Sequence, residues 1–220
     1  MVTVPYRLMR NVMVAAGVLY CSLLLEAVAG YPLDVHQSFL SELGARDQAT
    51  SPYARAMDLG AGVLVLIAAI LGRPAVRMHR DVAGLLISSA VFGAGTLFDS
   101  LSPMDCAPSA AEACRAAESQ GQAALVLHEI TSTLAGLGSI AMGIFALLIL
   151  RRSGGVRARA VAALAAAVVV TQAWLGIETG LEVLTGNDLH PPGILQRVSI
   201  LLMCIFLGTV LPGVRHACSR

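Results

Sequence analysis

Six apolar stretches divide this chain, and each is long enough to cross a lipid bilayer or nearly so. A helix needs about 20 mostly apolar residues to span the hydrocarbon core, where its backbone polar groups must be paired internally. The pattern therefore predicts an all-α membrane protein, a bundle of six transmembrane helices in one integral membrane domain covering residues 1–220. The predicted helices run over about 12–30, 57–72, 82–98, 123–150, 161–180 and 194–211, the last ending at the helix-stop pair Pro212-Gly213.

The amino-acid composition agrees with a membrane protein and excludes some functions. Only 13% of the residues are charged, whereas a soluble domain carries about 25%. The net charge of +1 gives no reason to expect nucleic acid as a partner. All fifteen basic residues are arginine, which excludes Schiff-base chemistry and any phosphate-binding loop that depends on lysine.

The arginines are divided unequally between the two sets of loops. Segments that stay in the cytoplasm carry the excess of basic residues. We therefore expect both termini to be cytoplasmic and the chain to lie in the cell (plasma) membrane. Eleven of the fifteen arginines lie on the predicted cytoplasmic side: Arg7, Arg10, Arg73, Arg77, Arg80, Arg151, Arg152, Arg157, Arg159, Arg215 and Arg220.

The first apolar stretch is open to a second interpretation. Arg7 and Arg10, followed by an apolar run that ends in Ala27-Val28-Ala29, also match a cleavable signal peptide. The nearly full length of the stretch and the position of Glu26, close to the cut site, favour an uncleaved helix. Cleavage would leave five spans.

The acidic residues gather on the side that is poor in arginine, and Asp81 is the exception. They form either solvated outer loops or an outward-facing pocket. Because ionisable side chains within spans are costly and usually face an interior or a watery cavity, we favour the pocket. The catalytic candidates are Asp99, His128, Glu129 and Glu178, and the binding candidates are Ser41, Glu42 and Arg197.

Three histidines on the same side are the candidate metal ligands: His36, His128 and His190. Histidine and carboxylate ligands hold zinc with one position open for water, so zinc is the cofactor that this composition suggests. The chain lacks an HExxH motif, and Ile194 stands four residues after His190, where a second histidine would complete a pair.

Two of the five cysteines, Cys106 and Cys114, share one polar loop on the predicted outer side. Disulfides persist in such oxidising compartments, and the turn-forming pair Pro108-Ser109 brings the ends of the loop together. We therefore expect a Cys106–Cys114 disulfide that shapes a lid over the outer ends of the third and fourth spans.

Short motifs at the helix ends resemble one multi-pass prokaryotic family. Residues 38–44 with Ser51-Pro52, directly before the second span, are similar to its S-x-LG … SP signature. The resemblance is to the family called domain of unknown function 998, and it implies an integral membrane fold without an assigned reaction. Further matches in the same order are Phe98-Asp99, Asp105-Cys106-Ala107-Pro108, Cys114, His128 and Gly193-Ile194-Leu195-Gln196-Arg197.

A second resemblance concerns a site alone. Ser41, Asp99, His128 and His190 are similar to the Ser, Asp and His residues near one membrane face in the ceramidase and adiponectin-receptor superfamily. This likeness implies metal-dependent lipid hydrolysis. The chain departs from that superfamily in lacking its H-x-x-x-H pair and in its number of spans.

These features favour a protein that binds or processes a lipidic or envelope-associated small molecule, with membrane lipids as partners, and they leave open whether it is an enzyme. One alternative is a non-catalytic accessory or structural subunit, in which structural ion pairs, such as Arg197 with Glu178 or Asp99, account for the charges. Another is a transporter of a small solute or ion.

The arginine distribution makes the topology testable. Reporter fusions after Arg152 and after Arg220 should be active as cytoplasmic fusions, and a fusion after Glu112 should be external. Alkaline phosphatase and fluorescent-protein activities in cells would measure this. An external C-terminus would contradict the six-span arrangement.

Overall fold

The computed structural model describes residues 4–77, 79–114, 123–152, 155–185 and 191–218. In these ranges six helical segments are long and apolar enough to cross a membrane, which is the predicted number. The first is formed by two consecutive helices, α1 and α2. The bounds are α1 Tyr6–Leu19, α2 Ser22–Val28, α3 Ser51–Gly72, α4 Arg80–Leu101, α6 Ala123–Leu150, α7 Val156–Thr185 and α8 Gly193–Cys218.

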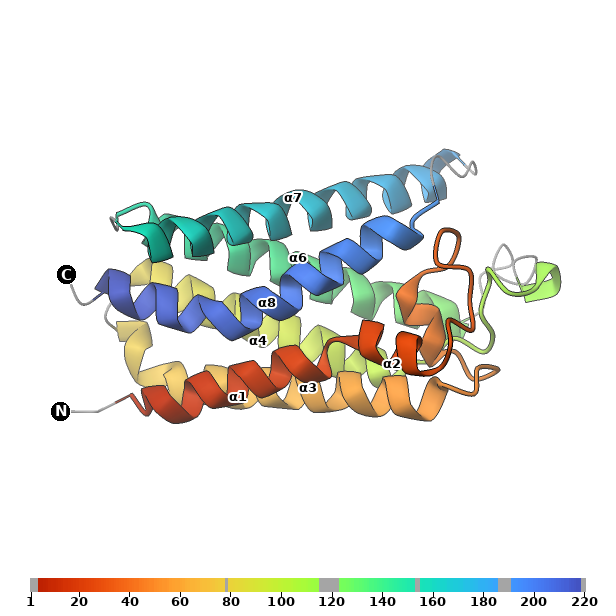
Figure 1. Cartoon of the computed structure of the whole chain (residues 1–220), viewed down its shortest axis with the longest axis horizontal. Helices are drawn as coiled ribbons and strands as arrows, with labels where there is room; N and C mark the ends of the chain where they lie inside the picture. The colour runs from red at the N-terminus through yellow and green to blue at the C-terminus, as the bar shows by residue number, and fades with distance from the viewer. Residues whose placement is uncertain (1–3, 78, 115–122, 153–154, 186–190, 219–220) are drawn as a thin grey trace.

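The spans lie side by side along the length of the molecule (Figure 1), and their contacts close them into a ring in chain order. Each packs against the next, and α8 returns to contact α1. α7 is the most peripheral, since 11% of its most apolar stretch is buried, compared with 33–50% in the other spans. The start of α1 and the end of α8 lie at the same end of the ring, which we call the arginine-rich end; the opposite end is the capped end.

The first span is broken, which the sequence did not predict. α1 ends at Leu19, and α2 begins at Ser22 after a change of backbone direction at Cys21. The amides at the break stay paired, because Cys21 donates to the Val18 carbonyl and Ser22 to the Tyr20 carbonyl. This satisfies the requirement that lipid imposes on backbone groups.

Several observed helices extend beyond their predicted ends, including α1 at its start and α7 at both ends, and the differences in α3 and α8 have a visible cause. α3 begins at Ser51, six residues before the predicted start, because the Ser51 hydroxyl donates to the Gly44 carbonyl at 2.8 Å and Pro52 fits the first turn. α8 continues through Pro212 to Cys218. A proline removes one backbone donor, and the remaining helical bonds carry α8 past it.

A single acidic residue organises the arginine-rich end. Asp81 is buried at the start of α4, and its amide donates to His79 Nδ1 at 3.1 Å. Its carboxylate lies 3.7 Å from an Arg152 amino group, in the segment that follows α6. The one acid on this side therefore joins the first turn of α4 to the end of α6.

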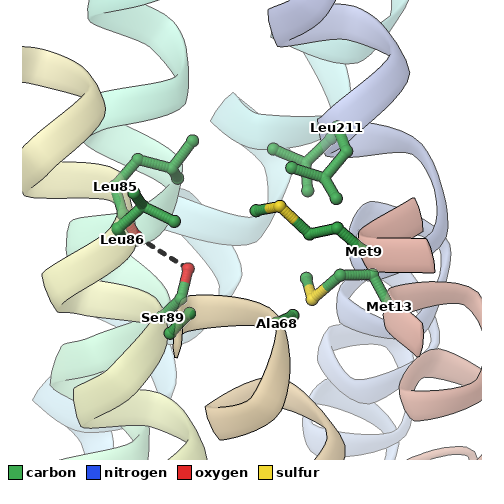
Figure 2. A pocket seen from close by; sticks show the side chains of 9 residues that line it. Met9, Met13, Ala68, Leu85, Leu86, Ser89 and Leu211 are labelled. Atoms are coloured by element: carbon green, nitrogen blue, oxygen red, sulfur yellow. Dashed lines mark hydrogen bonds between the residues drawn. The ribbon is translucent and has the colours of Figure 1, made fainter. Parts of the chain in front are cut away.

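The interior of the ring is closely packed. Large side chains such as Phe92, Met142 and Phe206 are fully buried. Near the arginine-rich end a cavity of about 20 Å³ remains between α1, α3, α4 and α8, where Met9 and Met13 point from α1 toward the other helices (Figure 2). Its lining is almost wholly apolar, so it is a packing defect rather than a polar site.

Two loops form a cap over the other end of the ring. We define the cap as residues 29–50, which connect α2 to α3, and residues 102–114, which follow α4. The two loops share a backbone hydrogen bond from Arg46 to the Met104 carbonyl. Their apolar side chains and Ala54 at the start of α3 form a second hydrophobic cluster, separate from that of the ring: Leu33, Leu40, Leu43, Ala45, Ala54, Met104 and Ala107.

The contact between α3 and α4 depends on the absence of side chains. A Cβ at Gly62 would lie 2.7 Å from the Gly93 carbonyl oxygen and 2.8 Å from the Leu97 amide nitrogen. Both neighbours are backbone atoms, which cannot move without shifting the helix. Small residues at such positions allow membrane helices to approach closely.

We expect Gly62→Ala to lower the free energy of unfolding by about 1–3 kcal/mol, because it overpacks this contact. The control is Gly136→Ala in α6, where an added Cβ would meet no atom within 4 Å among the described residues. Thermal melting of both variants in detergent would measure the difference. Equal melting temperatures would contradict the close packing of α3 on α4.

Candidate functional site

Polar side chains from three helices and from the first loop of the cap surround a small cavity at the capped end, and Pro103 and Met104 of the second loop complete its lining. α3, α4 and α6 provide its ionisable groups, and the cap closes it. The cavity measures about 10 Å³, which is enough for one water-sized group. It is lined by Ser41, Gly44, Arg55, Asp58, Asp99, Ser100, Pro103, Met104 and His128.

Three of the predicted site residues meet at this cavity: Ser41, Asp99 and His128. Arg55 and Asp58, which also line it, were not among the predicted site residues. The signal that could have found them is the presence of two ionisable side chains in the first two turns of a membrane helix, where charge is costly.

Asp99 and His128 form the centre of the site. Thr131 and Ser132 donate hydrogen bonds to the same oxygen of Asp99, Oδ1, at 2.8 and 2.7 Å. His128 Nδ1 lies 3.1 Å from that oxygen, without the alignment of a hydrogen bond. His128, Thr131 and Ser132 are three and four residues apart in α6, so they share the helix face that packs on α4.

The other two catalytic candidates do not join the cavity. Glu129 follows His128 directly, so it points to another side of α6, and it is exposed. Glu178 is half-buried on α7, and it is not among the residues that line the cavity. Of the predicted catalytic residues, only Asp99 and His128 lie at the site.

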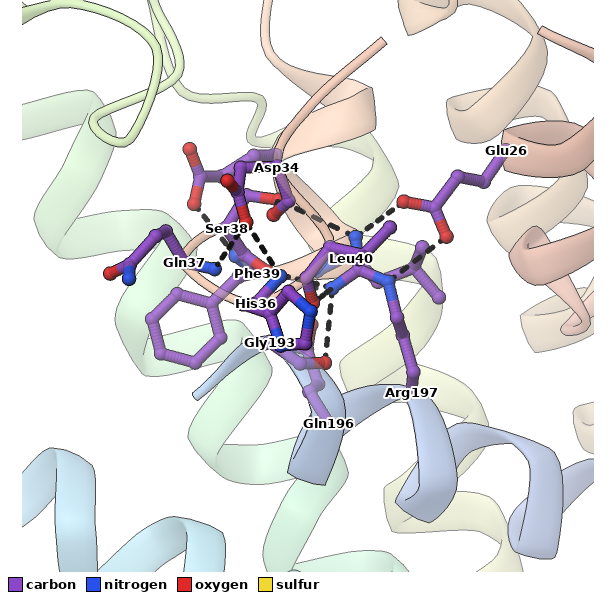
Figure 3. Close-up of polar contacts among 12 residues, drawn as sticks. Glu26, Asp34, His36, Gln37, Ser38, Phe39, Leu40, Gly193, Gln196 and Arg197 are labelled. Carbon is purple, nitrogen blue, oxygen red and sulfur yellow. Dashed lines mark hydrogen bonds and ion pairs between the residues drawn. The ribbon is translucent and has the colours of Figure 1, made fainter. Parts of the chain in front are cut away.

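Arg197 pairs with Glu26, so the predicted ion pair with Glu178 or Asp99 is wrong. The guanidinium Nε donates to one Glu26 oxygen at 3.0 Å, and an amino group donates to the other oxygen (Figure 3). Glu26 is 1% exposed and Arg197 is 7% exposed. A bidentate pair of this kind is strong and directional.

The second amino group of Arg197 fastens the first loop of the cap to α8. It donates to the Ser38 carbonyl at 2.8 Å and to the carbonyls of Val35 and Gly193 at 3.0 Å. The Gly193 amide in turn donates to the His36 carbonyl at 3.1 Å. These contacts occupy the guanidinium within the protein, which indicates that Arg197 holds the cap in place.

Glu42, the remaining binding candidate, joins the two loops of the cap. It is buried, and its carboxylate accepts from the Phe39 amide at 2.8 Å and from the Ser109 amide at 2.9 Å. Asp47 acts in the same way, because it accepts from the Ala107 amide at 3.1 Å. Both carboxylates satisfy backbone donors that a short, irregular loop would otherwise leave unpaired.

Cys106 and Cys114 lie in disulfide contact, with their Cα atoms 6.1 Å apart. This separation is within the range that a disulfide requires. The bridge closes the second loop of the cap, which contains Ala107 and Ser109, the residues that bind Asp47 and Glu42. The cysteines therefore lie in the loop that covers the site, as predicted.

Residues 13–211 match the family described as "Protein of unknown function (DUF998)". The chain belongs to the DUF998 family. The match runs from α1 into α8 and so includes part or all of every span. Searches of curated proteins and of solved structures return no match to this DUF998 protein.

The three histidines proposed as metal ligands lie in different surroundings in the DUF998 protein. His36 is exposed on the first loop of the cap, His128 lines the cavity, and His190 lies outside the described residues. Within the described ranges, no three or more His, Cys, Asp or Glu side chains are arranged to hold a metal ion. Zinc binding therefore stays a prediction.

A tight turn precedes the Arg197 contacts in the cap of the DUF998 protein. The Asp34 carboxylate accepts from the amides of His36 and Gln37 at 2.8 and 3.1 Å. These hydrogen bonds lower the pKa of Asp34. The turn is consequently favoured above the ordinary pKa of an aspartate, and this contribution is lost as the pH falls through the lowered value.

We expect Glu26→Gln in this DUF998 protein to lower the free energy of unfolding by about 3–5 kcal/mol, because it leaves the buried Arg197 charge unpaired. The matched control is Asp105→Asn, which breaks the exposed pair with Arg46 and should cost at most about 1 kcal/mol. Unfolding in detergent would be followed by circular dichroism. Equal losses for the two variants would contradict the role given to Arg197.

Proposed function

We propose that this protein binds the polar end of a lipidic or envelope-associated small molecule at the cavity formed by Asp58, Asp99 and His128. The observation that carries the proposal is the convergence of these side chains from α3, α4 and α6 beneath one cap. Ionisable groups within a membrane segment are costly and rare, and by default they indicate a functional site.

The surroundings of the cavity favour a molecule with both a polar and an apolar part. Next to Asp99 and His128, large apolar side chains on α4 and α6 point away from the ring and are exposed. In a bilayer these side chains face the acyl chains of lipids. A ligand could therefore place its polar group in the cavity and its tail along Phe98, Leu101, Leu127 and Ile130.

The same site holds the groups that processing of the ligand would need. Asp99 lies against the His128 ring, and Ser132 Oγ lies 3.5 Å from its other nitrogen, Nε2. An imidazole held next to a carboxylate is the usual arrangement for moving a proton in a reaction. His128 is the residue that we assign to this step if the bound molecule is also hydrolysed.

The proposal includes a topology. We place the cap outside the cell and both termini in the cytoplasm of a cell with this protein in its plasma membrane. The support is the excess of arginine at the end where α1 starts and α8 finishes. The cap, with its disulfide contact, then lies in the compartment where disulfides persist.

A second candidate function is that of a non-catalytic accessory subunit. The observation that favours it is the closed state of the capped end, where Glu42 and Arg197 hold both loops down. The cavity beneath them admits only a water-sized group. In this alternative the polar cluster stabilises the bundle, and a protein partner takes the place of a ligand.

Native mass spectrometry of the protein extracted from its own membrane would distinguish the two functions. We expect the wild type to retain a bound small molecule, and His128→Ala to retain about ten-fold less, because one hydrogen bond to a charged group contributes about 1.5–3 kcal/mol. His36→Ala, at an exposed position on the cap, is the control and should bind normally. A wild type that carries no specific molecule in any preparation favours the accessory subunit.

A further inference from the structure

The hydrogen bonds around the cavity show which groups are left for a ligand. Ser132 donates its hydroxyl proton to Asp99 at 2.7 Å. Its oxygen is then available to accept from His128 Nε2, 3.5 Å away, in the tautomer that carries the ring proton on Nε2. In that tautomer His128 Nδ1 is a hydrogen-bond acceptor 3.1 Å from Asp99 Oδ1, and it is buried without a hydrogen-bond partner among the described residues.

The carboxylates at the cavity are also left with free acceptor positions. Both hydroxyl groups that bind Asp99 use its Oδ1 atom, and within the described part of the chain no hydrogen bond reaches Oδ2. The Asp58 carboxylate likewise receives no hydrogen bond from the residues described. Arg55 lines the same cavity, but within the described residues it forms no ion pair with Asp58, and its Nε donates to the Ser100 carbonyl at 2.9 Å.

The cavity thus presents three unused acceptors, namely the Asp58 carboxylate, Asp99 Oδ2 and His128 Nδ1, and it has room for one water-sized group. A primary ammonium group has three N–H donors and no acceptor. It also supplies the positive charge that a buried carboxylate requires. A quaternary ammonium has no N–H donor and is too large for the cavity. A phosphate is disfavoured because its oxygens are hydrogen-bond acceptors, like the groups that line the cavity.

We propose, on the basis of the function proposed above, that the group bound between Asp58, Asp99 and His128 is a primary ammonium. Two sources share this chemistry: the headgroup of an aminophospholipid in the membrane and a free small amine. His128, which is 8% exposed, is the neutral acceptor, and Asp58 is the principal counter-ion. The specificity of the site for primary over quaternary amines follows from the number of N–H donors and from the size of the cavity.

The test uses the full-length protein in nanodiscs and measures melting temperature and bound lipid. Phosphatidylethanolamine and phosphatidylcholine nanodiscs, made with the same acyl chains, examine the lipid source. Ethanolamine and choline chlorides, added at equal ionic strength to phosphatidylcholine nanodiscs, examine the free amine. We expect ethanolamine or phosphatidylethanolamine to raise the melting temperature, and choline or phosphatidylcholine not to do so.

The decisive variant is Asp58→Asn, with Glu112→Gln, an exposed carboxyl-to-amide change in the cap, as its matched control. Asp58→Asn should weaken ethanolamine or phosphatidylethanolamine binding about ten- to a hundred-fold. It should melt no lower than the wild type without amine, because it removes an uncompensated carboxylate. Glu112→Gln should bind as the wild type does.

Each result supports one proposal or overturns it. A response to free ethanolamine that equals the response to the lipid identifies a soluble amine, and a response to the lipid alone identifies the headgroup. Equal binding of choline, or binding that Asp58→Asn leaves unchanged, overturns the ammonium proposal. If binding of some other headgroup still depends on His128, the proposed function survives that result, and if no headgroup binding depends on His128, both proposals are wrong.

Discussion

The capped end of the protein depends on one buried guanidinium. Arg197 is surrounded by the Glu26 carboxylate and by three carbonyl groups, two of them in the first loop of the cap. A buried charge is tolerated only when its partner and its hydrogen bonds are complete. The end of α2, the first loop and the start of α8 must therefore come together in one arrangement, since any other would leave the charge unpaired.

The position of the first loop against α8 determines how the other side chains of the capped end are arranged. Once the first loop is fixed against α8, Ser41 and Gly44 lie over the polar ends of α3, α4 and α6. The apolar cluster around Leu40 and Leu43 fills the space beneath the loop. Asp58, Asp99 and His128 are consequently enclosed by protein, although they lie at a level where helix ends commonly meet water.

The parts of the fold that sequence reasoning predicted correctly are those that depend on the bilayer. The length of an apolar stretch decides whether it spans, so six spans and the bounds of α6 could be predicted from the chain alone. The break after Leu19 could not be predicted from the chain, because the residues on both sides of it are mostly apolar. The end of α8 was predicted wrongly at Pro212. A proline removes only one backbone donor, and the other helical hydrogen bonds around it let α8 continue.

The candidate site was predicted in part for a related reason. Asp99 and His128 are ionisable residues in apolar helices, and that property is visible in the sequence. The partner of Arg197 is not visible, since Glu26 is 171 residues away, and the two meet only because α8 closes the ring against α1. Asp58 joins the site for a similar reason, through the packing of α3 on α4.

The bonds between the two loops of the cap have a consequence for how a molecule would enter. Glu42 and Asp47 in the first loop bind Ser109 and Ala107 in the second, so neither loop can lift while the other stays in place. Opening from the aqueous side is then one concerted event, with a rate set by the simultaneous loss of several hydrogen bonds. A molecule already dissolved in the bilayer avoids this barrier if it moves sideways between α4 and α6, past Phe98 and Leu127, so we expect the membrane to be the faster route to the cavity.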